Sequence, residues 1–497
     1  MNDQLILAID QGTTGTTVLL LDEAMRIRGK GYGEIPQSYP APGQVEHDPE
    51  AIWRSVLSAF AQARAQAPTG SIAGVGVTNQ RETVVMWERA TGRAVAPAIV
   101  WQDRRTAGRC EAMRAAGHEP LIQRTTGLLL DPYFSGTKIA WMLEHLPGLR
   151  QRAEAGDIAF GTVDSFLVWR LSGGKSHITD VTNASRTLLL DLAGLEWSAE
   201  LCRLFEVPPA ILPRVCPSSG SLAVTLGMNG VAGGLPDGTP IAGIAGDQQA
   251  ALFGQECFAR GEAKCTFGTG SFLLMNVGEK PVHSQHRLLG TVAWQTPHGT
   301  SYALEGSAFV SGALVQWLRD GLGIIKSSAE TEAIAQSVAD NGGVYLVPAF
   351  TGLGAPYWNP HARASITGLT RGVTSAHIVR AGLEAQAYQT EDLMRAMAED
   401  AGYPMTEIRV DGGMVKNSWV CQFIADITST PVLRPTVTET TALGAAYLAG
   451  MHIGMFKSLD EISKNWECEL RFSPNMPSSE REVLYQGWQK AVKQVLS

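Results

Sequence analysis

The chain has 497 residues, of which 44% are hydrophobic and 18% charged, and its formal net charge is −8. This length predicts two or more domains, the composition excludes a disordered chain, and the acidic charge excludes a broad nucleic-acid-binding surface. No apolar run is long enough for membrane insertion, and the N-terminus lacks a signal-peptide pattern. Seven scattered cysteines without a C-x-x-C pair favour reduced thiols. We therefore expect a cytoplasmic protein.

The first predicted strand, residues 5–9, ends in Asp10 and is followed by Gly12, Thr13 and Thr14. A glycine at such a turn lets backbone N–H groups approach an anion, and threonine hydroxyls add donors. The pattern therefore suits a phosphate group and its magnesium ion. An ordinary turn is the alternative, because turns favour these residue types on conformational grounds.

Further strands are predicted at residues 17–21, 72–78 and 83–87. Between them, a helix is predicted to begin at Pro49, with Asp48 as its N-cap and Glu50 at the positive end of the helix dipole. The first strands follow one another directly, as antiparallel strands do, and later strands alternate with helices. This order indicates a mixed α/β layered domain.

Polar and aromatic side chains follow several of these strands. Arg81 and Glu82 could hold vicinal hydroxyls, since a guanidinium donates and a carboxylate accepts hydrogen bonds. From the local sequence alone, an exposed ion pair at the end of a strand is the favoured alternative. Likewise, Trp101 is more often a core residue than a ligand contact, and Tyr133 more often a turn residue whose ring packs inward.

The chain then repeats its opening pattern. Residues 240–246 form a predicted small-residue strand that ends in Asp247, residues 268–270 repeat the glycine and threonine chemistry, and residues 411–413 again read acid–glycine–glycine. We predict two related halves, 1–250 and 251–497, each presenting phosphate-facing turns to a shared cleft.

Asp247 is the candidate catalytic base, because the small residues before it leave room for a ligand. The alternative is a helix N-cap for a helix over residues 248–253, and both roles could coexist. Residues 440–450 read as a small-residue helix whose purpose is close packing. The histidines and cysteines show no metal-ligand spacing.

Together, these segments resemble the FGGY carbohydrate kinases essentially from end to end. The segments that carry the resemblance are 79–83, 133–145, 161–164, 182–186, 245–249, 348–358, 368–373, 381–389 and 411–413. The resemblance implies an α/β fold with two RNase H-like domains of the actin/Hsp70/sugar-kinase type around a central nucleotide cleft.

The substrate-site motif is similar to that of family members that act on glycerol. The resemblance thus implies transfer of the ATP γ-phosphoryl group to a terminal glycerol hydroxyl, giving sn-glycerol 3-phosphate and ADP, the first step of glycerol catabolism. ATP and Mg²⁺ are the implied cofactors and glycerol the implied small-molecule partner, with no nucleic acid and no membrane insertion. A homodimer and a homotetramer both remain open.

The resemblance also assigns site residues, and it replaces the local alternatives for Arg81, Glu82, Trp101 and Tyr133. Asp247 is the implied base, and Asp10 with Asp247 the implied magnesium ligands. The implied substrate-binding residues are Arg81, Glu82, Trp101, Tyr133, Asp247, Gln248 and Phe272. The implied nucleotide-binding residues are Thr13, Thr14, Gly15, Thr17, Thr269, Gly312, Gln316, Gly413 and Asn417.

Two segments depart from the family pattern. Gly15, Thr16 and Thr17 stand where related kinases carry Ser-Ser-Arg, so the arginine that reaches the nucleotide phosphates is absent. Residues 233–240 lack the arginine of the loop that binds a sugar-bisphosphate inhibitor, so the sequence does not predict that inhibition. Two alternative functions remain: a kinase of another polyol or a ketose, and a nucleotide-dependent switch that binds a protein partner.

Overall fold

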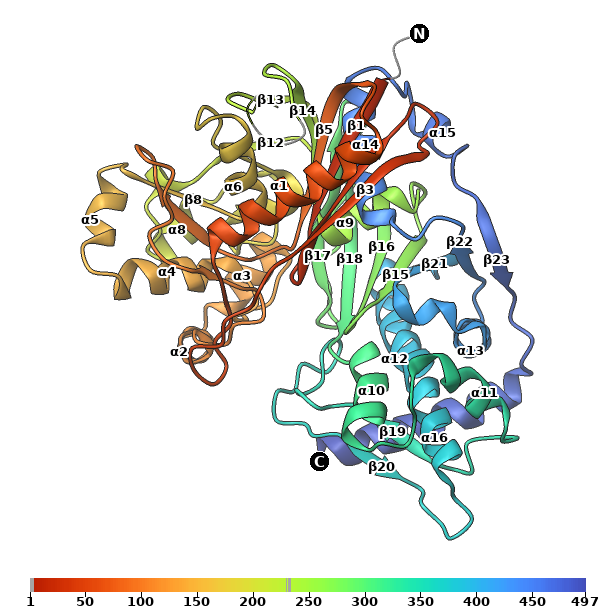
Figure 1. Cartoon of the computed structure of the whole chain (residues 1–497). Coiled ribbons are helices and arrows are strands. Elements are labelled where there is room, and N and C mark those ends of the chain that lie inside the picture. Colours follow the sequence, from red (N-terminus) through yellow and green to blue (C-terminus); the bar gives the residue numbers. More distant parts are fainter. Residues whose placement is uncertain (1–3, 229, 231–233) are drawn as a thin grey trace.

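Each half of the chain contributes one large β-sheet, and the two sheets lie side by side in the upper part of Figure 1. The computed structural model describes residues 4–228, 230 and 234–497. Gly233, which begins the loop compared above with an inhibitor-binding loop, lies outside the described residues. Within the described ranges, none of the helices has the length and apolar character to cross a membrane.

The first sheet has the strand order β13-β14-β5-β1-β2-β3. Its strands are β1 (Gln4–Gln11), β2 (Gly15–Leu21), β3 (Ile27–Glu34), β5 (Ser71–Asn79), β13 (Ser219–Val224) and β14 (Pro240–Gly246). Strands β1, β2 and β3 pair antiparallel, β5 and β14 continue the sheet in parallel, and β13 is antiparallel to β14. The predicted strand near residues 83–87 is instead β6 (Val85–Glu88), which pairs with β8 (Ile158–Gly161) outside this sheet.

The second sheet repeats this plan in the order β17-β18-β16-β15-β21-β22-β23. Its strands are β15 (Glu262–Phe267), β16 (Ser271–Gly278), β17 (Leu289–Thr296), β18 (Gly299–Ala308), β21 (Glu407–Asp411), β22 (Val432–Pro435) and β23 (Cys468–Phe472). Strands β15, β16 and β18 correspond in pairing to β1, β2 and β3, and β21, β22 and β23 correspond to β5, β14 and β13. The two halves are therefore built alike, as the repeated sequence pattern predicts.

Two helices, α9 (Asp247–Gly254) and α14 (Thr440–His452), pack against each other where the two sheets meet. The predicted boundary near residue 250 falls inside α9. A Cβ on Gly254 would lie 1.9 Å from the Thr440 carbonyl oxygen, and one on Gly444 would lie 1.8 Å from the Ala250 carbonyl oxygen. The helices thus cross in backbone contact, which is the packing role predicted for the small-residue segment.

The outer edge of the first sheet is covered by helix α1 (Pro49–Gln66), the orange helix that crosses it in Figure 1. Asp48 caps α1 as predicted, since its carboxylate accepts a hydrogen bond from the Glu50 backbone N–H. Three alternate residues of β3 are glycines, and a Cβ on Gly29, Gly31 or Gly33 would lie 1.9–2.6 Å from α1 backbone oxygens. The alternate side chains of β3 therefore point to the opposite face of the sheet.

Residues 80–218 form an insertion between β5 and β13, with a hydrophobic core of its own. Two further short strands, β4 (Glu46–His47) and β7 (Ala98–Ile99), pair at its border. The elements of the insertion include α2 (Ala107–Ala115), α3 (Glu119–Thr126), α4 (Ser135–His145), α5 (Leu149–Glu154), α6 (Val163–Leu171), β9 (Ile178–Asp180), α7 (Val181–Ala184), β10 (Leu190–Asp191), β11 (Glu196–Trp197), α8 (Ala199–Leu204) and β12 (Arg214–Cys216).

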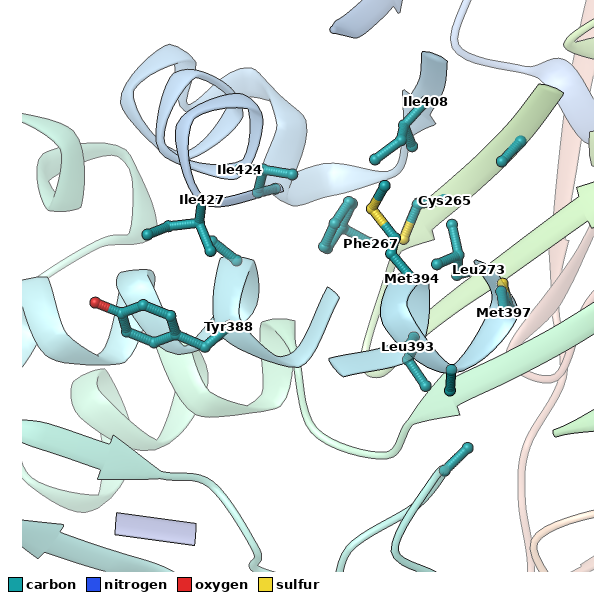
Figure 2. Close-up of a cluster of buried hydrophobic side chains, with 14 of the residues drawn as sticks. Cys265, Phe267, Leu273, Tyr388, Leu393, Met394, Met397, Ile408, Ile424 and Ile427 are labelled. Carbon is teal, nitrogen blue, oxygen red and sulfur yellow. The ribbon is translucent and has the colours of Figure 1, made fainter. Parts of the chain in front are cut away.

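Helices cover the second sheet and enclose the core drawn in Figure 2. In that view Phe267 and Cys265 of β15 face Met394 of α12 (Ser375–Ala401), and Ile424 and Ile427 come from α13 (Ser418–Thr428). The remaining elements of this half include α10 (Gly312–Gln316), α11 (Thr331–Gln336), β19 (Tyr345–Val347), β20 (Ser365–Thr367), α15 (Leu459–Ile462) and α16 (Ser478–Leu496). This packing fixes the ends of β15 and β21, where two of the predicted phosphate turns lie.

Candidate active site

Arg81 follows the carboxyl end of β5 and is 2% exposed. Its two terminal nitrogens donate to the two carboxylate oxygens of Glu305 at 2.6 and 2.9 Å. Its Nε lies 3.2 Å from an oxygen of Asp247. The local interpretation of Arg81 and Glu82 as an exposed ion pair is therefore wrong, because both side chains are buried and their partners come from distant parts of the chain.

Arg186 completes a group of four ions that we call the charged cluster: Arg81, Glu82, Arg186 and Glu305. The Nε of Arg186 donates to Glu82 at 2.7 Å, and one terminal nitrogen donates to Glu305 at 3.2 Å. All four side chains are at most 2% exposed, and the Nη1 of Arg186 has no hydrogen-bond partner in the described part of the chain. That nitrogen is a free donor beside the candidate substrate residues.

Glu305 keeps its charge because two guanidinium groups lie beside it, whereas burial outweighs the same two groups at Glu82 and raises the pKa of that carboxyl. Burial alone would raise the pKa of Glu305, but the guanidinium groups of Arg186 and Arg81 lower it to about 2. Buried ions of this kind are costly unless they are paired and hydrogen-bonded. The cluster therefore presents hydrogen-bonding groups whose positions are fixed before any ligand arrives.

The backbone of Glu82 is held in an unusual conformation. Its φ angle of +61° lies in the left-handed region. The Glu82 carbonyl accepts hydrogen bonds from the Ser135 hydroxyl at 3.0 Å and from the buried Lys138 ammonium at 3.3 Å. Lys138 also donates to the Tyr133 carbonyl at 2.5 Å. These hydrogen bonds stabilise a strained backbone conformation, and that conformation places the Glu82 carboxylate in the cluster.

Three aromatic rings form a wall beside the charged cluster. The Trp101 ring packs edge-on against Tyr133, with centroids 5.7 Å apart, and against Phe272, with centroids 6.4 Å apart. The indole N–H of Trp101 donates to the Thr13 hydroxyl at 2.9 Å. Trp101 is half-buried, so it is not the core residue that its local sequence suggests. Tyr133 lies in a turn and its ring packs against the core of the insertion, as its local sequence predicts. The wall suits the carbon chain of a small polar ligand.

Asp247 is the first residue of α9, and Gly246 occupies the N-cap position, so the N-cap interpretation of Asp247 is wrong. Its side chain is 28% exposed, and its carboxylate accepts from the Gln248 backbone N–H at 2.7 Å. Burial raises the pKa of Asp247, while Arg81 and Lys264 oppose the rise. Lys264 of β15 also donates to the Gln248 side-chain oxygen. Asp247 is thus a carboxylate that a ligand can reach.

Glycine turns close the ends of β1, β15 and β21. The Gly12 N–H donates to the Gly15 carbonyl at 2.8 Å, and the Gly268 N–H donates to the Gly270 carbonyl at 2.9 Å. Gly412 has a φ of +94°, and a Cβ there would lie 2.4 Å from the Phe267 carbonyl oxygen. Because Trp101 bonds Thr13 and packs on Phe272, the first two turns approach the same indole ring.

The other predicted nucleotide residues lie in the second half, apart from Thr17 on β2. The Gly312 N–H donates to the Gly268 carbonyl at 2.9 Å, so α10 begins directly on the second turn. Gln316 is exposed at the end of that helix. Asn417 caps α13, and its amide donates to Thr331 at 3.3 Å. Among the residues that the structure describes, no hydrogen bond joins Gln316 or Asn417 to the turns, so their nucleotide role stays a prediction.

The predicted magnesium ligands are Asp10 and Asp247. Burial raises the pKa of Asp10 to about 8, and the nearby carboxylates of Asp247 and Glu439 add to the rise. Among the described residues, no group of three or more His, Cys, Asp or Glu side chains could hold a metal ion. In sites that bind phosphates, Mg²⁺ is held by one or two protein carboxylates together with phosphate oxygens and water. Asp10 and Asp247 fit that kind of site.

Sequence reasoning missed three of the residues described here: Glu305, Arg186 and Lys138. Glu305 lies inside β18 between a leucine and a glycine, which gives no local signal. Arg186 and Lys138 stand in segments that carry the family resemblance, but no role was assigned to them. The available signal is a charged residue inside a segment that is otherwise expected to be buried. That signal becomes useful only when its oppositely charged partner on another element is known.

The first half of the chain, residues 5–254, matches the FGGY family of carbohydrate kinases, N-terminal domain. Residues 263–453 match the C-terminal domain of the same family. A glycerol kinase of Dechloromonas aromatica is 53% identical over 100% of this chain and 98% of its own length. A glycerol kinase of Rhodospirillum centenum is 54% identical over 99% of this chain and 98% of its own length.

Solved structures agree with these sequence comparisons. The structure of Plasmodium falciparum glycerol kinase with ADP superposes with a TM-score of 0.94 and 36% identity, covering 100% of this chain and 99% of that one. A xylulose kinase of Lactobacillus acidophilus has a TM-score of 0.89 at 22% identity, over 99% of each chain, which shows the fold alone. The predicted two-domain mixed α/β fold of the sugar-kinase type is thereby confirmed.

Proposed function

The chain belongs to the FGGY family of carbohydrate kinases, and from this premise we propose that it is an ATP-dependent glycerol kinase. The reaction would transfer the γ-phosphoryl group of ATP to a terminal hydroxyl of glycerol, giving sn-glycerol 3-phosphate and ADP. The observation that carries the proposal is the charged cluster, which meets the aromatic wall at Arg81 and Tyr133. Glycerol kinases more than 50% identical over nearly the whole chain support the choice of substrate.

Glycerol needs donors and acceptors for its hydroxyls and an apolar surface for three carbons. Arg81 supplies donors and Glu82 supplies an acceptor, in positions that their ion pairs with Glu305 and Arg186 fix. Trp101 and Phe272 supply the apolar surface. The hydroxyls of a bound substrate would form hydrogen bonds with these polar groups. An analogue without the hydroxyls would leave the same groups buried without partners, so the site should discriminate strongly against it.

The phosphoryl transfer needs a group that accepts the proton of the attacking hydroxyl. Asp247 would take this role: the terminal glycerol oxygen forms a bond to the γ-phosphorus, the bond from that phosphorus to the β,γ-bridging oxygen breaks, and the hydroxyl proton passes to an Asp247 carboxylate oxygen. The contact of Asp247 with Arg81 orients the carboxylate toward the site where the glycerol would bind. Positioning and charge neutralisation provide most of the acceleration in this class of reaction.

Mg²⁺ is the expected cofactor. Asp10 and Asp247 would hold it together with phosphate oxygens of ATP, and when bound it neutralises charge that develops on the phosphates. The glycine turns at residues 12–15, 268–270 and 412–413 would supply backbone N–H groups to those phosphates, with Thr13, Thr14 and Thr269 adding hydroxyls. We place the reaction in the cytoplasm, which is supported by seven cysteines that are all free, six of them buried.

A competition assay tests the substrate. The purified chain, with ATP and Mg²⁺, is given glycerol, dihydroxyacetone, erythritol and xylulose, and kcat/KM is measured for each by coupled ADP detection. We expect glycerol to have the largest value. A larger kcat/KM for xylulose would show a ketose kinase instead, and ADP release that no polyol changes would indicate a nucleotide-dependent switch.

A further inference from the structure

Tyr32 stands in a row of side chains that leads to the predicted magnesium ligand. On neighbouring antiparallel strands, Tyr32 of β3 is directly opposite Thr17 of β2, and Thr17 is directly opposite Asp10 of β1. Directly opposite residues point to the same face of a sheet. The glycines of β3 take up the face toward α1, so this row lies on the other face.

The same face of β3 borders the second half of the chain. Lys30, two residues before Tyr32, forms an ion pair of 2.5 Å with Glu439, the residue directly before α14. Glu439 is also among the charges that raise the pKa of Asp10. Side chains on this face of β3 therefore lie at the edge of the region between the two halves, where the glycine turns are.

The ring of Tyr32 occupies the space beside Gly15. A Cβ built on Gly15 would lie 2.3 Å from the Tyr32 hydroxyl oxygen and 2.5 Å from the ring carbon that bears it. The hydroxyl lies 3.4 Å from the Thr14 carbonyl oxygen, to which it donates. The tyrosine thus brings a hydroxyl to the place that a side chain on residue 15 would occupy, directly on the first phosphate turn.

The backbone of Tyr32 is anchored although its side chain is not buried. The amide of Gln62 on α1 bonds both sides of the peptide: its oxygen accepts from the Tyr32 N–H at 3.3 Å, and its nitrogen donates to the Tyr32 carbonyl at 2.8 Å. Tyr32 is nevertheless 49% exposed. A fixed backbone with an exposed hydroxyl is the arrangement that a ligand-binding residue needs.

We propose that Tyr32 is a nucleotide-binding residue whose hydroxyl donates a hydrogen bond to a phosphate oxygen of the bound nucleotide. The inference rests on the proposed function, in which the turn at residues 12–15 holds those phosphates. The present bond to Thr14 is long, so a phosphate oxygen at normal distance is the stronger acceptor. Residues 15–17 depart from the pattern of related kinases, and the glycine at position 15 leaves room for the Tyr32 ring.

The direct test is the variant Tyr32→Phe, with the dissociation constants of ATP and ADP measured by calorimetry in the absence of glycerol. Loss of one hydrogen bond to a charged group should weaken nucleotide binding by roughly 5- to 30-fold. Tyr403→Phe is the matched control, because the Tyr403 hydroxyl has no partner in the described part of the chain and should leave both constants unchanged.

A reciprocal pair of variants separates ligand binding from simple packing on a glycine. Gly15→Ser should weaken binding, since its side chain displaces the Tyr32 ring. In a Tyr32→Ala background, the same Gly15→Ser change returns a hydroxyl to the turn, so the double variant should bind ATP more tightly than Tyr32→Ala alone. If Tyr32 only packs against Gly15 and does not bind the nucleotide, adding Gly15→Ser to Tyr32→Ala should not improve ATP affinity. The double variant would then bind ATP no more tightly than Tyr32→Ala.

The outcomes of these tests are distinct from those of the substrate test. Wild-type nucleotide affinity in Tyr32→Phe would overturn the proposal, whether or not the melting temperature changes. If the unaltered chain binds ATP but does not phosphorylate glycerol, the proposed function fails while Tyr32 can still be judged from nucleotide affinity. A chain that binds no nucleotide would contradict both.

Discussion

The charged cluster is built from side chains and the glycine turns from backbone. The cluster consists of four buried side chains whose charges pair with one another, such as Arg81 with Glu305 at 2.6 and 2.9 Å. The turns consist of backbone, and Gly12 and Gly268 shape theirs through main-chain hydrogen bonds. The side that would bind glycerol depends on side-chain identity, and the side that would bind phosphate depends on backbone shape.

This difference predicts which substitutions are damaging in each region. In the charged cluster, removal of one charge leaves another buried charge without its partner. In the turns, most side-chain changes alter one donor among several, whereas a new Cβ at a glycine with no free space distorts the backbone itself. Under the proposed function, Asp247 and Asp10 take part in the reaction and do not serve as supports for either region.

The largest effect is expected for Asp247→Asn. It keeps the shape of the side chain but cannot accept the proton, so kcat should fall by about 10²- to 10⁴-fold. Steady-state kinetics with glycerol and ATP measure it, and Asp460→Asn, a change at an exposed carboxylate, is the control. Near-normal turnover in Asp247→Asn would rule out its role as the base.

Glu305→Gln should cause the largest loss of stability, because it leaves Arg81 and Arg186 buried with one fewer negative charge. We expect the free energy of unfolding to fall by about 3–5 kcal/mol in urea titrations. Glu144→Gln is the matched control, since Glu144 pairs with Arg109 at the surface and should cost less than about 1 kcal/mol. Equal losses in the two variants would mean that burial does not set the energy of the cluster.

A smaller effect is expected at the third glycine turn. Gly412→Ala places a Cβ 2.4 Å from the Phe267 carbonyl oxygen at a φ of +94°, and should lower the free energy of unfolding by about 1–3 kcal/mol. Gly413→Ala places its Cβ in open space and should leave stability nearly unchanged. Thermal unfolding of the two variants compares them, and identical melting temperatures would show that the turn does not depend on glycine at residue 412.

A further effect concerns pH. The pKa of Asp10 is raised from 3.8 to about 8, so the folded state holds this proton more tightly than the unfolded state. The contribution of Asp10 to stability therefore falls as pH rises from about 4 to about 8. Asp10→Asn does not titrate, so it should gain about 3–4 kcal/mol over the wild type between pH 5 and pH 8, measured by urea unfolding. A difference that does not change with pH would contradict the raised pKa.

Local signals in the sequence located the turns better than the charged cluster. The strand that ends at Asp10, the Asp48 cap and the small-residue helix near residue 440 each depend on neighbouring residues, and all three are confirmed. The local interpretation of Arg81 failed because its partner Glu305 lies 224 residues away in the sequence. Only the family resemblance placed Arg81 in a site, and neither it nor the local pattern assigned a role to Glu305.

The most direct measurement is ADP formation by the unaltered chain with ATP and Mg²⁺, in the presence and absence of glycerol. If the charged cluster and the glycine turns serve one glycerol kinase site, ADP should form at a rate that saturates with glycerol, with one sn-glycerol 3-phosphate produced for each ADP. ADP release at the same rate without glycerol, or without matching glycerol phosphate, would contradict it.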